Sequence, residues 1–91
     1  MNLQIKANRR ALDEDVFRVA KTGKKRAPIA MADIVGGLAP DFESVSQVNI
    51  RAALNRLAAG GLVAKIGKGP STRYYVASKR KALPSTWGER G

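Results

Sequence analysis

The sequence predicts one small α+β domain in which three helices are followed by a C-terminal β-hairpin. The chain has 91 residues, enough for a single core. Apolar residues recur at helical spacing in three segments, and two strand-like runs, LVAKI and RYYVA, flank the turn GKGPST. We divide the chain into a basic N-terminal arm (residues 1–10), the domain (residues 11–77) and a basic C-terminal tail (residues 78–91).

The first helix is expected to begin near Leu12. Residues 1–10 are basic and weakly patterned, so they fit either a strand or a flexible arm. One helical face then collects Leu12, Val16, Val19 and Ala20. We expect Asp13, Glu14 and Asp15 in the first turn, where exposed N–H groups favour carboxylates, so this acidic cluster needs no metal ion.

The second helix is expected in the segment IAMADIVGGL, and it should be short. Its two glycines each lower helix stability by about 1 kcal/mol relative to alanine. Ile29 fits a short strand just before it, and Ile34 faces the core. Pro40 prevents the helix from continuing, and Phe42 covers the core from the following turn.

The third helix is expected from Ser46 to Ala59. Ser46 is the preferred N-cap, although Ser44 and Gln47 also have the spacing of a capping box. The pair Gly60-Gly61 ends the helix. Its inward stripe consists of Ile50, Ala53, Leu54 and Leu57.

The outward face of this helix contains no acidic residue. It carries Gln47, Val48, Asn49, Arg51, Ala52, Asn55 and Arg56. A face that meets only water usually mixes Glu with Lys. Arg, Asn and Gln instead match guanine and adenine edges in the DNA major groove, and small apolar residues such as Val48 and Ala52 can contact a thymine methyl group. Alternatively, Val48 packs beneath the second helix or at a dimer contact.

The run VSQVNIRAALNRLAAGGLV resembles the recognition helix and first wing strand of winged helix-turn-helix regulators. It is most similar to the DNA-binding domains of GntR-type and MarR-type repressors. The matching positions are Val45, Ser46, Ile50, Ala53, Leu54, Leu57, Gly61, Leu62 and Val63, with Gly67-Lys68-Gly69 at the wing tip. The connection from Leu38 to Ser46 is longer than in a tight helix-turn-helix, and there is no effector-binding domain, so no small-molecule effector is expected.

The resemblance implies that the third helix enters the major groove and that the wing lies on the backbone or in the minor groove. The expected base contacts are Gln47, Val48, Arg51, Ala52 and Asn55. The expected backbone contacts are Lys24, Lys25, Arg26, Ser46, Asn49 and Arg56, and the wing contacts are Lys65, Lys68 and Arg73. Lys79, Arg80 and Lys81 are further candidates for phosphate contacts. Trp87 is expected to dock on the domain or on a partner, and one of Tyr74 and Tyr75 faces inward.

Composition and charge indicate a polyanionic partner. Lys and Arg number 17 against 7 acidic residues, which gives a formal net charge of +10. The chain has no cysteine and no histidine, so thiolate chemistry, histidine bases and sites built from these ligands are excluded. The turn GKGPST lacks the spacing of a phosphate loop. We expect no cofactor, no metal and no enzymatic activity.

The function expected from these features is sequence-preferring binding of double-stranded DNA. A small transcriptional repressor, or an accessory factor of a plasmid or phage, would act as a homodimer or as a cooperative array. Binding of structured RNA or of the ribosome, and a role as a protein–protein adaptor, are the alternatives. With no signal peptide and no apolar span, we expect a cytoplasmic protein that does not bind membranes.

Overall fold

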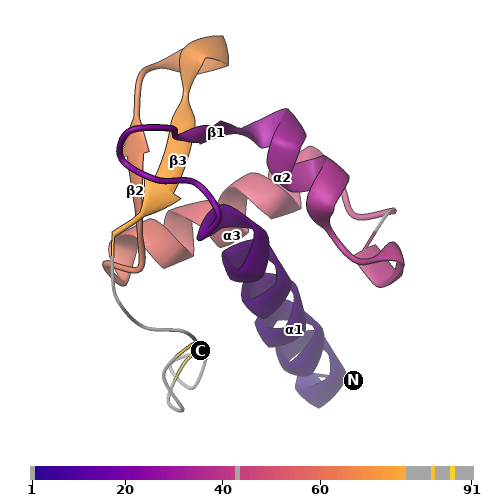
Figure 1. Ribbon diagram of the computed structural model, residues 1–91. Coiled ribbons are helices and arrows are strands. Elements are labelled where there is room, and N and C mark those ends of the chain that lie inside the picture. The colour runs from indigo at the N-terminus through magenta and orange to yellow at the C-terminus, as the bar shows by residue number, and fades with distance from the viewer. Residues whose placement is uncertain (1, 43, 78–82, 84–86, 88–91) are drawn as a thin grey trace.

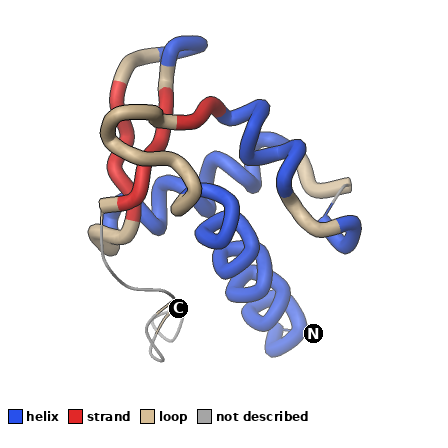
Figure 2. The backbone as a smooth tube through the Cα atoms, viewed as in Figure 1, coloured by secondary structure: helices blue, strands red, loops and turns tan. Residues whose placement is uncertain are grey.

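The computed structural model describes residues 2–42, 44–77, 83 and 87, with only the backbone for residues 2–8 and 70. This part of the chain forms three α-helices and a three-stranded antiparallel sheet (Figure 1, Figure 2). In chain order the elements are α1 (Asn2–Ala20), β1 (Ile29–Ala30), α2 (Met31–Gly37), the 3-10 turn η1 (Pro40–Phe42), α3 (Gln47–Ala59), β2 (Val63–Ile66), the 3-10 turn η2 (Gly69–Ser71) and β3 (Arg73–Val76). The predicted α+β class, with three helices before a hairpin, is confirmed, and the layout is compatible with a winged helix.

The sheet joins the hairpin to the short strand before α2. Its order is β1-β3-β2, so β3 is the central strand. Tyr74 of β3 lies opposite Lys65 of β2 on one side and opposite Ile29 of β1 on the other. The hairpin and the strand at Ile29 agree with the sequence analysis. Their pairing into one sheet is a new feature of the structure.

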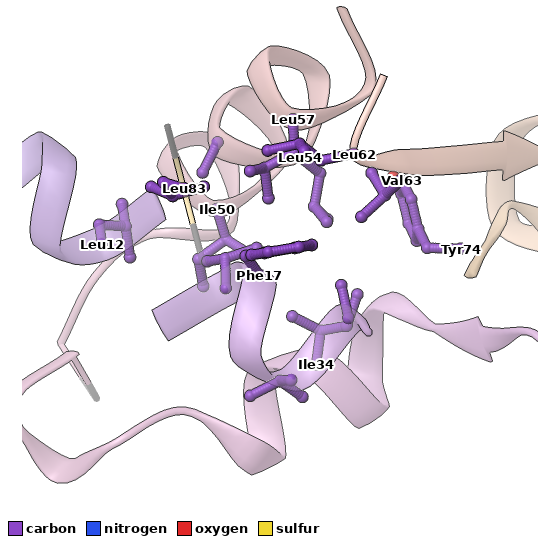
Figure 3. Packing of buried hydrophobic residues seen from close by; sticks show 14 residues of the cluster. Leu12, Phe17, Ile34, Ile50, Leu54, Leu57, Leu62, Val63, Tyr74 and Leu83 are labelled. Carbon is purple, nitrogen blue, oxygen red and sulfur yellow. The ribbon is translucent and has the colours of Figure 1, made fainter. Parts of the chain in front are cut away.

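One core connects the helices with the hairpin (Figure 3). The four predicted residues of α3 are each at most 1% exposed, and all four predicted residues of α1 are buried. Phe17, which lies outside the predicted stripe, is only 2% exposed. It is buried because α1 packs against both α2 and α3, so its buried face is wider than a single stripe. Tyr74 is the inward tyrosine, whereas Tyr75 is half-buried on the other face of the sheet.

The first helix begins earlier than predicted. It starts at Asn2, so residues 2–10 are the first half of α1 and form neither a strand nor a flexible arm. This segment lacks glycine and proline, and its Leu, Gln, Lys, Ala and Arg residues all favour helix. The predicted position of the acidic cluster in the first turn of this helix is therefore wrong. The middle of α1 holds Asp13, Glu14 and Asp15. Each carboxylate is stabilised there by an ion pair with an arginine: Asp13 with Arg56, Glu14 with Arg10, and Asp15 with Arg18.

Contacts between α1 and the end of α2 determine where the turn η1 begins. The Asp15 carboxylate accepts hydrogen bonds from Arg18 Nε (2.8 Å) and from the Ala39 backbone N–H (2.7 Å). Arg18 Nη2 also donates to the Gly37 carbonyl (2.8 Å). A Cβ atom on Gly37 would lie 2.8 Å from Cγ1 of Val19, so glycine permits this close approach of the two helices. Together these contacts position η1, and hence the start of α3.

Two residues of the C-terminal tail belong to the folded domain. Leu83 is 8% exposed and lies in the core, and Trp87 packs against it. The ring of Trp87 lies so close to Gly60 that a Cβ atom there would be 2.7 Å from Trp87 Cζ3. The predicted docking of Trp87 on the domain is confirmed, and the domain therefore extends past the predicted boundary at residue 77. Lys79, Arg80 and Lys81 lie outside the described residues.

Candidate nucleic-acid interface

The third helix presents the exposed side chains that the sequence analysis singled out. Ser46 is its N-cap, as predicted, because its Oγ accepts the Asn49 backbone N–H at 3.3 Å. Gln47, Arg51 and Asn55 are exposed and recur every four residues, so they form a line along α3. Val48 beside them is 72% exposed. Val48 therefore does not pack beneath α2, and the alternative of a dimer contact stays a prediction.

The line of polar residues borders a hollow between α3 and the hairpin. The lining residues are Ala30, Met31, Ala32, Gln47, Arg51, Lys65, Gly69, Thr72 and Tyr74. Among the described residues that line this hollow, two carry a cationic side chain and none carries a carboxylate. Neither Arg51 nor Lys65 forms an ion pair with any carboxylate that the structure describes. The hollow is thus an uncompensated cationic surface.

Strand register explains how Lys65 comes to face α3. Residues directly opposite in an antiparallel pair have side chains on the same face of the sheet, and alternate residues share a face. Lys65 lies opposite Tyr74 and two residues after Val63. Tyr74 and Val63 are both buried in the core that α3 covers. Lys65 consequently projects on the α3 side, at the edge of the core.

The Tyr74 hydroxyl connects the hairpin electrostatically with Arg51. Burial raises the pKa of the Tyr74 phenol, because the ionised form would lose hydration. The positive charge of Arg51 acts in the opposite direction and favours the phenolate. The net direction is upward, so Tyr74 is a neutral hydroxyl near pH 7. Tyr74 is one of the residues that line the hollow, and a neutral hydroxyl can donate a hydrogen bond.

The opposite flank of α3 is chemically different. A second hollow is lined by Arg9, Ala11, Leu12, Asp41, Phe42, Val45, Asn49, Ala52 and Arg56. Asp41 thus lines the same hollow as Asn49 and Ala52, two of the predicted DNA contacts. A carboxylate disfavours the approach of a phosphate. The seven predicted residues of the helix therefore separate into an acid-free wing side and a mixed α1 side.

Arg56, one of the predicted backbone contacts, is engaged within the domain. Its guanidinium donates to Asp13 twice, from Nη2 to Oδ1 (2.6 Å) and from Nε to Oδ2 (2.9 Å). The hydrogen bonds from Arg56 to Asp13 raise the pKa of the guanidinium further. The side chain of Asp13 is only 2% exposed, so this pair ties α1 to α3 inside the domain. The structural role of Arg56 is therefore this internal bridge, and its predicted contact with a DNA backbone stays a prediction.

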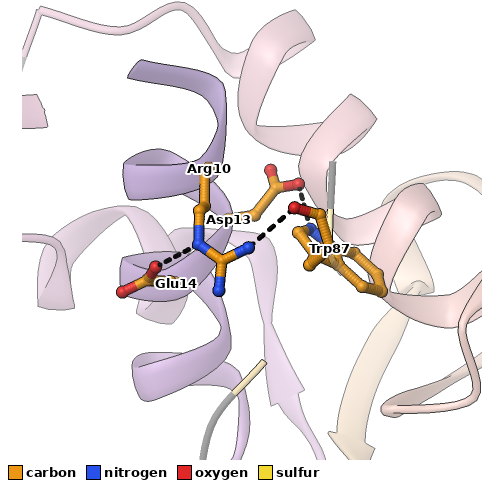
Figure 4. Close-up of polar contacts among 4 residues, drawn as sticks. All are labelled: Arg10, Asp13, Glu14 and Trp87. Carbon is orange, nitrogen blue, oxygen red and sulfur yellow. Dashed lines mark hydrogen bonds and ion pairs between the residues drawn. The ribbon is translucent and has the colours of Figure 1, made fainter. Parts of the chain in front are cut away.

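The same carboxylate also holds the C-terminal tail (Figure 4). Trp87 Nε1 donates to Asp13 Oδ2 at 2.8 Å, and Arg10 Nη1 donates to the Trp87 carbonyl at 2.7 Å. Arg10 is in turn paired with Glu14 one turn along α1 (3.0 Å). The sequence analysis missed Asp13 because an acidic residue within a charged run gives no sign of being buried.

The wing tip is shaped by two glycines with positive φ. Gly67 has φ 85°, and a Cβ atom there would lie 2.6 Å from the Ser71 carbonyl oxygen. Gly69 has φ 56°. Lys68 between them is exposed, as the prediction of a wing contact requires. Arg73 lies opposite Ile66 in the register, so it projects on the other face of the hairpin from Lys65.

The predicted cations before β1 lie away from the wing tip. Lys24 and Ala27 form a small bridge that exposes Lys24, Lys25 and Arg26 on a tight turn. The turn is attached at the end of β3, where the Val76 N–H donates to the Gly23 carbonyl (2.9 Å). The wing tip joins the opposite end of β3, at Arg73. The structure therefore does not gather residues 24–26 with Lys68.

In the part of the chain that the structure describes, no group of three or more Asp or Glu residues is arranged to hold a metal ion. None of its helices combines the length and hydropathy needed to cross a membrane.

Comparison with known proteins adds no assignment. No protein-family model matches the chain, and no curated protein or solved structure is significantly similar to it.

Proposed function

We propose that this protein binds double-stranded DNA with sequence preference through a winged helix-turn-helix fold. In this proposal α3 enters the major groove and the β2–β3 hairpin is the wing. The supporting observation is the acid-free surface in which Gln47, Arg51 and Asn55 line the exposed side of α3 next to the cationic hairpin. Side chains of these types are suited to base edges and phosphates, whereas an ordinary solvated face would carry acids as well.

The physiological role that we propose is that of a small transcriptional repressor or of an accessory factor of a plasmid or phage, acting in the cytoplasm. One α3 helix contacts few base pairs, so a homodimer or a cooperative array on a repeated site would supply the remaining specificity. Neither a cofactor nor a catalytic step is part of this proposal.

Selection from random duplexes at rising salt concentration tests the proposal. The selected duplex and a scrambled one would then be compared by fluorescence anisotropy. Asn55→Ala should weaken binding to the selected duplex by about tenfold and leave the scrambled duplex unchanged, because a lost base contact corresponds to about 1–3 kcal/mol. Asn49→Ala is the matched control, since Asn49 lies on the α1 side of the same helix beside Asp41. It should change binding to either duplex less than twofold.

Competition with structured RNA completes the experiment. If no duplex is enriched and one RNA is retained at high salt, the DNA proposal is wrong and the RNA alternative is correct. If binding is equal for all duplexes and disappears as salt rises, α3 makes no base-specific contacts, and sequence preference must be abandoned.

A further inference from the structure

We infer that the hollow between α3 and the hairpin is a binding site for one phosphate group, held by Arg51 and Lys65. Gln47, Thr72 and Tyr74 complete the site as uncharged hydrogen-bond donors. That this phosphate belongs to a DNA backbone rests on the proposed function. The site itself depends only on the chemistry of its lining.

Two cations from different elements meet at this hollow. Arg51 reaches it from α3, and Lys65 reaches it from β2 because its register with Tyr74 directs it to the α3 side. The planar guanidinium offers a fork of donors that fits two oxygens of a phosphate, and the ammonium adds a compact charge. None of the ion pairs among the described residues involves Arg51 or Lys65. The nearest described carboxylate in the sequence of the lining segments, Asp33, accepts the Ala30 backbone N–H at the start of α2 and is not itself among the lining residues.

The remaining lining residues favour a tetrahedral anion over a base edge. The two charged groups in the hollow are solely donors, whereas the Thr72 and Tyr74 hydroxyls and the Gln47 amide can donate or accept. Two positive charges in one hollow match an anion, whereas a base edge carries no net charge. A phosphate has several acceptor oxygens and can use all of these groups at once.

This site changes the role of Arg51. The sequence analysis predicts that Arg51 contacts a base, whereas Arg51 directed into the hollow contacts the backbone. A base contact gives specificity, and a phosphate contact gives affinity without sequence information. The two roles are therefore separable by experiment.

The first arm of the test uses inorganic phosphate. The protein is titrated with sodium phosphate at constant ionic strength, and NMR follows the Arg51 side-chain Nε–H and the backbone N–H of Thr72. We expect saturable shifts in the native protein, and binding at least tenfold weaker in Arg51→Gln and in Lys65→Gln. Arg73→Gln is the control, because it removes the same charge from the other face of the same hairpin. It should retain phosphate binding within twofold.

The second arm uses duplex DNA. Arg51→Gln and Lys65→Gln should each weaken the selected and the scrambled duplex by the same factor, about tenfold for a charge-assisted hydrogen bond. Each should also reduce the slope of log affinity against log salt by about 1. Saturating phosphate should compete with duplex for the native protein and not for Arg51→Gln.

The outcomes separate the two proposals. If phosphate shifts do not saturate, or are the same in Arg51→Gln, the phosphate site is refuted. Loss of binding only to the selected duplex in Arg51→Gln would also refute it, while leaving the proposed function intact. Binding of phosphate at these residues without binding of any duplex would support the site, identify a free phosphoryl group as its ligand, and refute the DNA proposal.

Discussion

Replacement of Asp13 by asparagine should destabilise the domain more than any other single loss of charge on α1. The Asp13 side chain is 2% exposed and accepts two hydrogen bonds from Arg56 and one from Trp87. Asparagine has nearly the same shape but carries no charge. Its NH₂ group would also face donors where the second carboxylate oxygen accepted a hydrogen bond.

The magnitude follows from the burial of the two partners. Removing one member of a buried ion pair destabilises a protein by about 3–5 kcal/mol, since the other charge stays buried without a partner. The Arg56 side chain is 35% exposed, so its guanidinium can recover part of its hydration. The carbonyl oxygen of asparagine can still accept from Trp87. We therefore expect a loss of about 2–3 kcal/mol, which corresponds to a decrease in Tm of roughly 10–20 °C for a domain of this size.

Urea unfolding monitored by circular dichroism measures this loss, and the fluorescence of Trp87, the only tryptophan, reports on the network itself. Glu14→Gln is the matched control, because Glu14 is adjacent on α1 and also pairs with an arginine but is 54% exposed. It should change the free energy of unfolding by about 0.5 kcal/mol or less. Adding Arg56→Met to Asp13→Asn should recover stability, because no charge then remains unpaired. A loss below about 1 kcal/mol for Asp13→Asn would refute this reasoning.

Three further predictions concern other parts of the fold. Burial opposes ionisation of Asp15, but hydrogen bonds from Arg18 and a backbone N–H outweigh it and hold its pKa below the usual 3.8. The contribution of Asp15 to stability is therefore complete above its unfolded-state pKa and is lost as pH falls through its folded-state pKa. Acid titration of Asp15→Asn should accordingly show a flatter dependence of stability on pH below about pH 4. Gly60→Ala should displace the Trp87 ring, with a red-shifted emission and a loss of about 1–3 kcal/mol in urea unfolding. Replacing all three residues of 24–26 by serine should change duplex affinity less than about threefold by anisotropy in 0.15 M salt, where charges are screened over about 8 Å.

Two of these predictions have a matched control. Gly36→Ala is the counterpart of Gly60→Ala, since a Cβ atom there meets nothing within 4 Å, and it should leave the emission of Trp87 unchanged. Lys68→Ser should weaken all duplexes, in contrast to the triple replacement of 24–26. An unchanged acid titration for Asp15→Asn would contradict the stabilising contacts of Asp15 with Arg18 and Ala39. A large loss of duplex affinity for the triple variant would contradict the placement of residues 24–26 away from the bound duplex.

Local sequence signals predicted the helix faces of this fold well. The inward stripe of α3, its Ser46 N-cap and its glycine end all depend on residues close in sequence. Short-range hydrogen bonds and periodic burial determine such features, so they can be inferred without knowledge of the tertiary structure. The exposure of Gln47, Arg51 and Asn55 follows from the same periodicity.

Features that depend on distant contacts were not predictable in this way. Burial of Phe17 requires α1 to have two packing partners, and burial of Asp13 requires Arg56 and Trp87, which lie 43 and 74 residues away. The predicted start of α1 near Leu12 was wrong for a different reason. The helix propensity of residues 2–10, a local signal, already favours the observed start at Asn2. The hairpin register could have been found: pairing Ile66 with Arg73 across the turn places Lys65 opposite Tyr74, and thereby directs Lys65 towards α3.

Most of the described acidic residues take part in contacts that hold the fold together. Asp13, Glu14 and Asp15 each neutralise an arginine within or between the helices, and the Asp33 side chain accepts the Ala30 backbone N–H at the start of α2. Four carboxylates are thus committed to holding the fold together, on α1 and α2. Arg51 and Lys65, where α3 and the hairpin meet, have no such partner in the described part of the chain. In the proposed function, cations without internal partners would attract and orient a polyanion before contact, so the arrangement of the acids, and not only the number of lysines, would determine binding.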